Sequence, residues 1–119
     1  MTWELTSKPP NLPEEFIETY KHKVSWYWIS INQTFSEDEI VKYKDYVDWS
    51  NISKHQKLSE EFISKYITKL DTNVILLKYK LSKEFLLTNA NYLDYLLVIN
   101  SQDLDEVSKE YFQLLNTTS

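Results

Sequence analysis

Few side chains in this chain of 119 residues are suited to acid–base or metal chemistry. His22 and His55 are its only histidines, and it has no cysteine. Catalysis needs a nucleophile beside a base, a pair of carboxylates, or a cluster of metal ligands. Thiolate chemistry and disulfides are therefore excluded, and no hydrolase, phosphate-loop or zinc-finger spacing occurs. We interpret both histidines as solvated surface residues.

Three runs of carboxylates are the other candidates for chemistry. They are Glu14-Glu15, Glu37-Asp38-Glu39 and Glu60-Glu61. Such runs are acidic enough to attract a metal ion, because carboxylate oxygens are the ligands of hard cations. However, the second and third runs directly follow Ser36 and Ser59, which are good helix N-caps. Negative charge is stabilised at the start of a helix, so we predict helix N-termini here, and we expect no metal and no cofactor.

The composition excludes several functional classes. Glycine and arginine are both absent, and the formal net charge is −5. A phosphate-cradling loop needs the close backbone approach that glycine allows. Without arginine there is no bidentate fork for guanine or phosphate, and a negative chain is repelled by nucleic acid. We therefore predict that the protein is not an enzyme and does not bind nucleic acid directly.

Length and hydropathy predict a folded domain rather than a membrane protein. Hydrophobic residues make up 42% of the chain, which is close to the globular norm. No apolar run reaches membrane-spanning length, and no charged-then-apolar signal segment stands at the start. We expect a single domain with a real core, no membrane contact, and a cytoplasmic location.

A 23-residue repeat organises the whole chain. Trp3, Trp26 and Trp49 follow one another at this interval, as do Ile17, Ile40 and Ile63, and Tyr20, Tyr43 and Tyr66. A fixed period in this range indicates a repeat architecture, in which each unit buries its apolar face by stacking on its neighbours. The clearest copy runs from Val47 to Lys69.

Five copies fit this period. They lie near 1–23, 24–46, 47–69, 70–92 and 93–115, and together form a single repeat domain over 1–119. The end copies depart most from the pattern, as expected of repeats that face water on one side. In the first copy, Pro10 replaces glutamine. We interpret the fifth copy as lacking one residue, with Asp105-Glu106-Val107 in the places of Glu60-Glu61-Phe62, after which Tyr111 and Leu115 fall into step.

Two helix-capping positions recur in the copies. The first is held by Thr2, Ser25, Asp48, Asp71 and Asp94, and the second by Ser36, Ser59, Ser82 and Asp105. Their side-chain oxygens can accept orphan backbone N–H groups, and Ser36 with Glu39 forms a capping box. In the third copy this predicts helix A from Asp48 to about Gln56 and helix B from Ser59 to about Lys69. The sequence therefore predicts an all-α fold, a short α-solenoid of about five 23-residue helix-turn-helix repeats.

The inward face of helix A is marked by residues spaced at i, i+3, i+4 and i+7. In the third copy these are Trp49, Ile52, Ser53 and Gln56. We predict that Trp26 and Trp49 are core residues of equivalent units.

Glutamine recurs on the same inward face, as Gln33, Gln56 and Gln102. A buried amide without partners costs about 1–3 kcal/mol, so each should be hydrogen-bonded. We predict that these side chains tie loop backbone between copies. A ladder of glutamines that binds a ligand is the alternative.

The outward positions of helix A hold the candidate binding residues. In the third copy they are polar, namely Ser50, Asn51, Lys54 and His55. The second copy instead has Tyr27, Trp28 and Ile31, and apolar groups where the repeat predicts water indicate an interaction patch. We predict that these three residues anchor a protein partner. Lys54 and His55 of the next copy would form the rim. The alternative is that helix A is buried on two sides.

The string from Trp49 to Ile63 reads W-x-x-I-S-x-x-Q-x-L-S-E-x-F-I. It resembles a short repeat of uncharacterised proteins of large DNA viruses and phages. The likeness covers most of the chain with decreasing quality, and the fourth copy has neither the tryptophan nor the glutamine. The resemblance implies a viral type of origin, and hence a host-cell cytoplasmic location, but it supplies no catalytic residues.

Three functions follow as hypotheses. The first is a non-enzymatic protein–protein interaction module of viral or phage type that inhibits a host protein complex, such as a defence complex. The second is an acidic nucleic-acid mimic that blocks a nuclease through Glu37, Asp38, Glu60 and Glu61. The third is a self-assembling structural protein, with oligomers formed through the open repeat ends.

Overall fold

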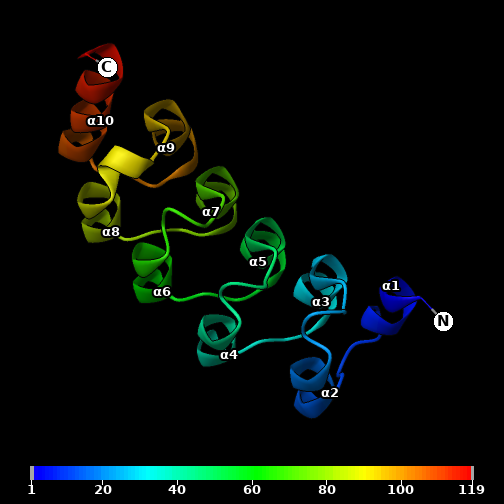
Figure 1. Ribbon diagram of the computed structural model, residues 1–119. Coiled ribbons are helices and arrows are strands. Elements are labelled where there is room, and N and C mark those ends of the chain that lie inside the picture. The colour runs from blue at the N-terminus through cyan, green and yellow to red at the C-terminus, as the bar shows by residue number, and fades with distance from the viewer. Residues whose placement is uncertain (1, 119) are drawn as a thin grey trace. The chain divides into compact units, whose positions relative to one another are not determined.

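The computed structural model describes residues 2–118 and is all-α over that range, with ten α-helices, one 3-10 helix and no strand (Figure 1). The elements are α1 (Trp3–Ser7), α2 (Glu14–Thr19), α3 (Trp26–Asn32), α4 (Glu37–Lys42), α5 (Trp49–His55), α6 (Glu60–Lys65), α7 (Thr72–Lys78), α8 (Lys83–Thr88), η1 (Ala90–Tyr92), α9 (Tyr95–Ser101) and α10 (Glu106–Thr118). Helix A and helix B of each copy alternate along the chain. The predicted helical repeat solenoid is thus confirmed.

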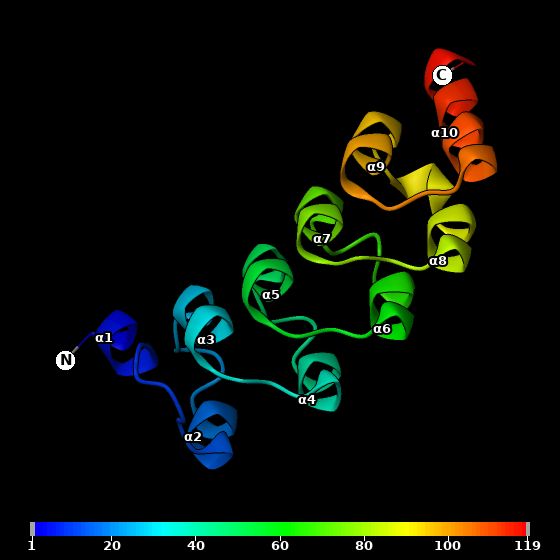
Figure 2. The same ribbon diagram turned by 180° about the vertical axis from the view of Figure 1, so that it is seen from behind.

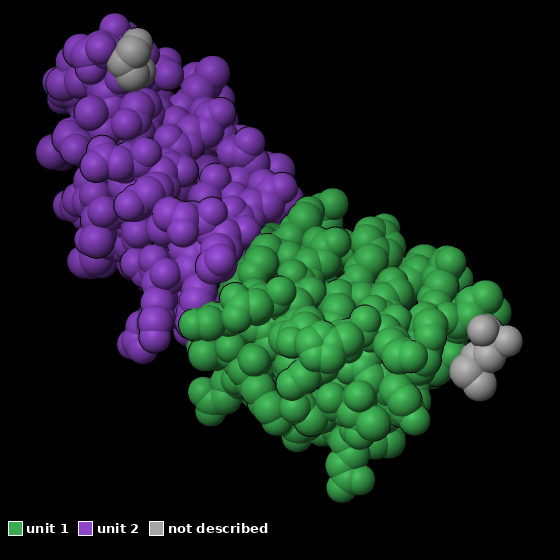
Figure 3. All heavy atoms as spheres, in the orientation of Figure 1, with its two compact units in different colours: residues 1–58 green, residues 59–119 purple. Residues whose placement is uncertain are grey.

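The chain separates into two compact units, Met1–Leu58 and Ser59–Ser119 (Figure 3). In the first unit, α1, α3 and α5 lie in one row and α2 and α4 in a second row (Figures 1 and 2). In the second unit, α7 and α9 form one row, and α6, α8 and α10 the other. That the chain is one domain stays a prediction.

The recurring caps start most of the helices, as predicted. Asp48 accepts a hydrogen bond from the Asn51 N–H at 3.1 Å at the start of α5. Ser36 and Glu39 form the complete capping box of α4. Side-chain caps of the same kind are made by Thr2, Ser59, Asp71, Ser82, Asp94 and Asp105. Ser25 occupies the N-cap of α3 but makes no side-chain cap bond.

Helix B of the third copy is shorter than predicted, because α6 ends at Lys65 rather than near Lys69. Tyr66 then takes a non-helical conformation, and its carbonyl accepts from the N–H groups of Lys69 and Leu70 at 2.9 and 3.1 Å. This tight turn directs the chain toward the next helix A. Lys65 therefore lies in the last helical turn, where a cation is favourable, and Lys69 lies beyond it.

The core is made by two recurring aliphatic positions. Helix A supplies Ile29, Ile52, Ile75 and Val98, and helix B supplies Ile17, Ile40, Ile63 and Leu86, none more than 3% exposed. These side chains follow one another at 23-residue intervals. We call these eight side chains the isoleucine ladder. Burial of a full aliphatic side chain contributes about 1.5–3 kcal/mol, so the isoleucine ladder is the main apolar support of each unit.

The tryptophans are not core residues, which corrects the prediction for Trp26 and Trp49. Both are only half-buried. The indole N–H of Trp26 donates to the Lys21 carbonyl at 2.8 Å, and that of Trp49 donates to the Lys44 carbonyl at 3.0 Å. Each ring thus covers the end of the preceding turn and keeps one edge in solvent, as a large side chain with a polar handle often does.

The recurring glutamines tie loop backbone between copies, as predicted. The Gln56 amide donates to the carbonyls of Ser30 and Gln33 at 3.1 and 2.6 Å and accepts from the Phe35 N–H at 2.9 Å. Gln102 makes the equivalent three bonds to the fourth copy. Gln33 makes two bonds to the first copy, because it donates to the Pro9 carbonyl at 2.7 Å and accepts from the Leu12 N–H at 2.9 Å. We call this three-bond arrangement the glutamine clasp.

A recurring serine adds a second polar tie between copies. The Ser7 hydroxyl accepts from the N–H of Ser25 at 2.8 Å, and the Ser30 hydroxyl accepts from the N–H of Asp48 at 2.9 Å. Both serines are fully buried. The tie satisfies a backbone donor just before each helix A, where burial without a partner would be costly.

The fifth copy keeps the 23-residue register, so the predicted loss of one residue is wrong. Asp105 caps α10 by accepting from the Ser108 N–H at 2.7 Å, in the place where Ser36 caps α4. Phe112, which keeps the register of Tyr43, is fully buried, whereas Tyr111 is exposed. Helix α10 has 13 residues, whereas α8 has 6, and its buried residues are Ser108 and Phe112.

Candidate interaction surface

The predicted patch lies on α3, within the first unit. Tyr27 is 53% exposed, whereas Trp28 and Ile31 are half-buried. The rings of Tyr27 and Trp28 pack edge to face, with centroids 5.2 Å apart at an angle of 87°. Such a pair is worth about 0.5–1.5 kcal/mol beyond its buried area. The tryptophan therefore holds the exposed tyrosine ring in place.

Trp28 also faces the first copy. The Lys8 ammonium nitrogen lies 4.5 Å from the centroid of the Trp28 ring, which is a cation–π contact. Lys8 is steered there by its ion pair with Glu4 at 3.7 Å. The half-burial of Trp28 thus agrees with the alternative considered for helix A, that it is covered by its neighbours. Tyr27 is left as the exposed anchor of the patch.

Lys54 and His55 are exposed in the last turn of α5. The positive charge of Lys54 at this end of the helix interacts favourably with the helix dipole. Since α5 packs beside α3 in the first unit, the two residues lie on the helix that neighbours the patch.

Asn51 is not outward-facing, which corrects its expected position. Its side chain is buried, and its amide nitrogen lies 3.4 Å from the Tyr27 carbonyl oxygen. Asn51 is the third residue of its helix A, as Trp28 is of α3, and in both copies this residue contacts the preceding copy. Helix A is therefore contacted on two sides, along the row of helices as well as by helix B.

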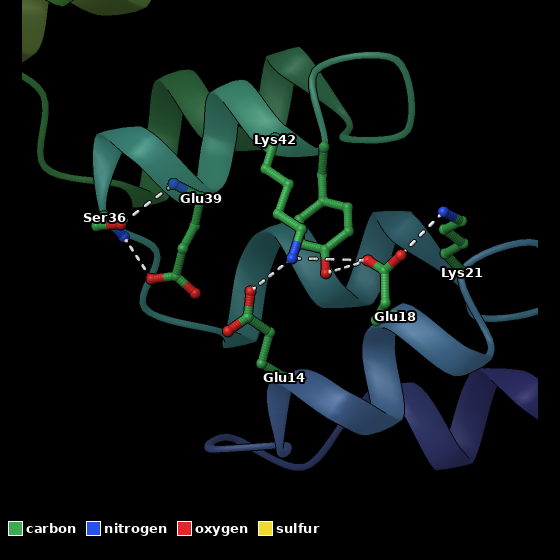
Figure 4. A network of polar contacts seen from close by, with 7 residues as sticks. Glu14, Glu18, Lys21, Ser36, Glu39 and Lys42 are labelled. Carbon is green, nitrogen blue, oxygen red and sulfur yellow. Dashed lines mark hydrogen bonds and ion pairs between the residues drawn. The ribbon is translucent and has the colours of Figure 1, made fainter.

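A polar network joins α2 to the end of α4 in the first unit (Figure 4). The Tyr43 hydroxyl donates to Glu18 at 2.8 Å, and Lys21 binds the other oxygen of the same carboxylate at 3.0 Å. Lys42 reaches Glu14 at 3.0 Å. The network therefore connects the first two copies, and with the hydrogen bonds of Gln33 and the tie of Ser7 it positions α3 against α1.

The protonation states of the network follow from these contacts. Burial, followed by the hydrogen bond to Glu18, raises the pKa of Tyr43 to about 12. The bonds from Lys21 and Tyr43 hold the pKa of Glu18 below its usual value. The hydrogen bond to Glu14 raises the pKa of Lys42. Each contact favours the ordinary charge state at neutral pH, so the network is structural and has no group poised for proton transfer.

Replacing Tyr43 by phenylalanine is expected to lower the free energy of unfolding by about 1 kcal/mol, because a hydrogen bond to a partly exposed carboxylate is lost. The matched control is Tyr20→Phe, at the same place one copy earlier, where the tyrosine is 38% exposed. That change should cost under about 0.5 kcal/mol. Urea unfolding of both variants measures the difference, and equal costs would contradict the role given to Tyr43.

The same pair of variants has a pH signature. The pKa of Tyr43 is raised in the folded state, to about 12 from 10.0. The stability that the phenol contributes is therefore complete below pH 10 and is lost as pH rises through 12. The difference in the free energy of unfolding between the parent and Tyr43→Phe should therefore become smaller between pH 10 and pH 12, as urea unfolding at a series of pH values would measure.

Only part of the acidic surface considered for nucleic-acid mimicry is exposed. Asp38 and Glu61 are exposed, and Glu37 and Glu60 are half-buried. The Glu60 carboxylate is committed to the N-cap of α8, because it accepts from the N–H and hydroxyl of Ser82 at 2.8 and 2.7 Å. These residues start helices, as their positions predicted.

One surface that the sequence did not indicate lies in the second unit. Leu87 of α8 and Val107 and Tyr111 of α10 line an apolar groove with Lys83 at its edge. Lys83 pairs with Asp105 at 3.2 Å. The predicted register of the fifth copy did not indicate this groove, because it placed Tyr111 in step with Tyr43, which is buried. A correct register would have left Val107 and Tyr111 on an open face.

The described residues, 2–118, were also compared with what a metal site requires. Over that range, no three His, Asp or Glu side chains gather closely enough to hold a metal ion. His22 is exposed and packs against the Tyr46 ring at 5.5 Å. His55 is also exposed, so both histidines lie at the surface.

Comparison of the chain with protein-family models, curated proteins and solved structures finds no match in any of the three. Within the described residues, no helix has the length and apolar character needed to cross a bilayer.

Proposed function

We propose that the protein is a non-enzymatic protein-binding module that engages its partner through the α3 surface of the first unit. The observation that carries this proposal is Tyr27, a large aromatic side chain 53% exposed on a helix that is otherwise fixed on two sides. Tyrosine and tryptophan dominate the energetics of protein interfaces because they bury a large area at a low entropic cost.

The surroundings of Tyr27 support this role. Trp28 holds the ring edge to face, and Lys8 in turn covers Trp28. The anchor is therefore pre-organised, which reduces the entropy lost on binding. Ile31 extends the apolar area, and Lys54 and His55 supply a polar rim on the neighbouring helix. We propose this set of residues as the interface.

The kind of partner follows from the resemblance to viral and phage repeat proteins. We propose a host protein, such as a component of a defence complex, which the module blocks by occupying its surface in the host cytoplasm. Nucleic-acid mimicry is less favoured because Glu60 is already bound to Ser82, and Glu14 and Glu18 are bound to lysines.

The test is affinity purification from the native host with the parent and with Tyr27→Ser, which installs the residue of the third copy. A partner that uses this surface should bind the variant at least about thirtyfold more weakly, since a hot-spot residue contributes 2 kcal/mol or more. The variant should stay folded, because its side chain is mostly exposed.

Leu77→Ser is the matched control. Leu77 is an exposed apolar residue, also on a helix A, but in the second unit. A protein retained by the parent and by Leu77→Ser, and lost with Tyr27→Ser, supports the proposal. If the parent, Tyr27→Ser and Leu77→Ser all retain the partner equally strongly, the α3 surface is not the interface.

A further inference from the structure

The groove between α8 and α10 differs from the other grooves of the helix-B layer. One such groove lies between α2 and α4 in the first unit, and another between α6 and α8 in the second. Carboxylates, a lysine and a threonine line the first, and carboxylates, hydroxyl groups and an amide surround a single phenylalanine in the other. Leucine, valine and tyrosine line most of the α8–α10 groove. Its apolar character is therefore particular to this pair of copies.

The bottom of the α8–α10 groove is apolar as well. Between α2 and α4, the Tyr43 hydroxyl donates to Glu18 at 2.8 Å, and an equivalent side-chain hydrogen bond joins α6 to α8 at 3.1 Å. The same two places of the repeat are held by Leu87 and Phe112 in the α8–α10 pair. Phe112 is fully buried and Leu87 is partly exposed. An apolar contact thus replaces the polar tie of the other two grooves.

Val107 and Tyr111 occupy positions that face solvent in every copy. The equivalents of Val107 in the first four copies are all acidic, those of Tyr111 are threonine or lysine, and all eight are exposed. They are Glu15, Asp38, Glu61 and Glu84, and Thr19, Lys42, Lys65 and Thr88. The exposure of Val107 (76%) and Tyr111 (43%) therefore belongs to these positions of the repeat. Apolar side chains where four copies place polar ones indicate an interaction surface.

The Tyr111 ring is restrained by its surroundings. It packs on the ring of the buried Phe112, with centroids 5.5 Å apart at an angle of 71°. A tyrosine held in this way offers a large contact area at a low entropic cost. Val107 lies four residues earlier on the same side of α10, where it extends the apolar surface along the helix.

The two helices add negative charge beside the groove. Lys83, at its edge, is neutralised by Asp105 at 3.2 Å. Glu84 follows Lys83 on α8, Glu110 precedes Tyr111 on α10, and both are exposed. Neither of these two carboxylates makes an ion pair within residues 2–118. An apolar groove between carboxylates is complementary to a helix whose apolar face is bordered by lysine or arginine.

The same charges disfavour two other occupants. In a symmetric contact with a second copy, each partner presents the same surface, so that Glu84 and Glu110 would meet carboxylates. A membrane with anionic lipids attracts basic segments, and an acidic border is repelled by it. The charge pattern therefore favours a basic protein segment.

We propose that the α8–α10 groove binds a basic amphipathic helix of a partner protein. Its apolar side chains lie along Leu87, Val107 and Tyr111, and the cations beside them face Glu84 and Glu110. This surface belongs to the second unit, whereas the α3 surface belongs to the first. The protein thus has a binding surface in each unit.

The probe is a synthetic peptide of leucine and lysine, about 14 residues long so that a helix can form. Leucines at i, i+3, i+4 and i+7 give it one apolar face. Fluorescence anisotropy of the labelled peptide measures binding to the whole chain, and we expect saturable binding at one site. A peptide of the same composition in scrambled order should bind at least about tenfold more weakly, because its leucines cannot enter the groove together.

Val107→Glu separates recognition by the groove from general charge attraction. The substitution installs the residue of the first, third and fourth copies at an exposed position, so the fold should be kept. Added negative charge alone would strengthen the binding of a basic peptide. We expect binding at least about tenfold weaker instead, because the apolar surface is interrupted. Leu77→Glu makes the same change at an exposed leucine of α7, and it should not weaken binding.

Tyr27→Ser should bind the peptide as the parent does, which keeps this test independent of the α3 surface. The proposal is overturned if the parent does not bind the peptide, if the scrambled peptide binds equally well, or if Val107→Glu binds as tightly as the parent or more tightly. A dimer of the parent that Val107→Glu abolishes, seen by analytical ultracentrifugation, would assign the groove to a second copy and overturn it too. So would binding of the parent, but not of Val107→Glu, to phosphatidylserine vesicles.

Discussion

Replacing Gln56 by leucine is expected to lower the free energy of unfolding by about 3 kcal/mol or more. The substitution keeps the side chain's bulk but leaves the Ser30 and Gln33 carbonyls and the Phe35 N–H without the amide that binds them. Each buried polar group left unsatisfied costs about 1–3 kcal/mol. Urea denaturation followed by circular dichroism measures the loss.

Gln113→Leu is the matched control for this prediction. It makes the same chemical change at an exposed position of α10, and it should alter stability by under about 0.5 kcal/mol. A Gln56→Leu protein as stable as the Gln113→Leu protein would show that the clasp contributes little and that apolar stacking alone joins the copies.

The second large effect is expected at Ile52. This side chain is fully buried in α5, and Ile52→Ala should destabilise the fold by about 2–5 kcal/mol, through lost burial and the cavity left behind. Ser50→Ala on the exposed side of the same helix should cost under about 0.5 kcal/mol. Thermal unfolding of the two variants compares them directly. A cost for Ile52→Ala below about 1 kcal/mol would contradict the assignment of the isoleucine ladder as the core.

The repeat, the caps and the clasp could be predicted from the sequence because each depends on local chemistry. An aspartate or serine directly before a helix usually serves as its N-cap. A glutamine on an apolar face must be hydrogen-bonded, because a buried amide without partners is costly. Hence the starts of α4, α5 and α6 and the role of Gln56 were predicted correctly.

The width of the buried face could not be predicted in the same way. Periodicity within one helix identifies one face, but α3 is packed by α1 and α5 along the row as well as by the core. Asn51 and Trp28 are covered for that reason. The prediction that the tryptophans are core residues was wrong because a conspicuous repeated residue is not always the most buried one. The isoleucine three positions later takes that place.

The structure leaves fewer of the predicted binding residues exposed, but it keeps the candidate site on α3. Of the predicted anchors, Tyr27 keeps an exposed ring, and Trp28 supports it from a half-buried position.

The central claim, that the α3 surface binds a protein, is tested most directly by site-specific photocrosslinking. A benzophenone amino acid is placed at position 27 and, as a control, at position 77, and each protein is irradiated in an extract of the native host. We expect one discrete crosslinked protein from position 27, which disappears when excess unlabelled parent is added but persists with excess Tyr27→Ser. Absence of any competed product at position 27, or the same product at position 77, would contradict it.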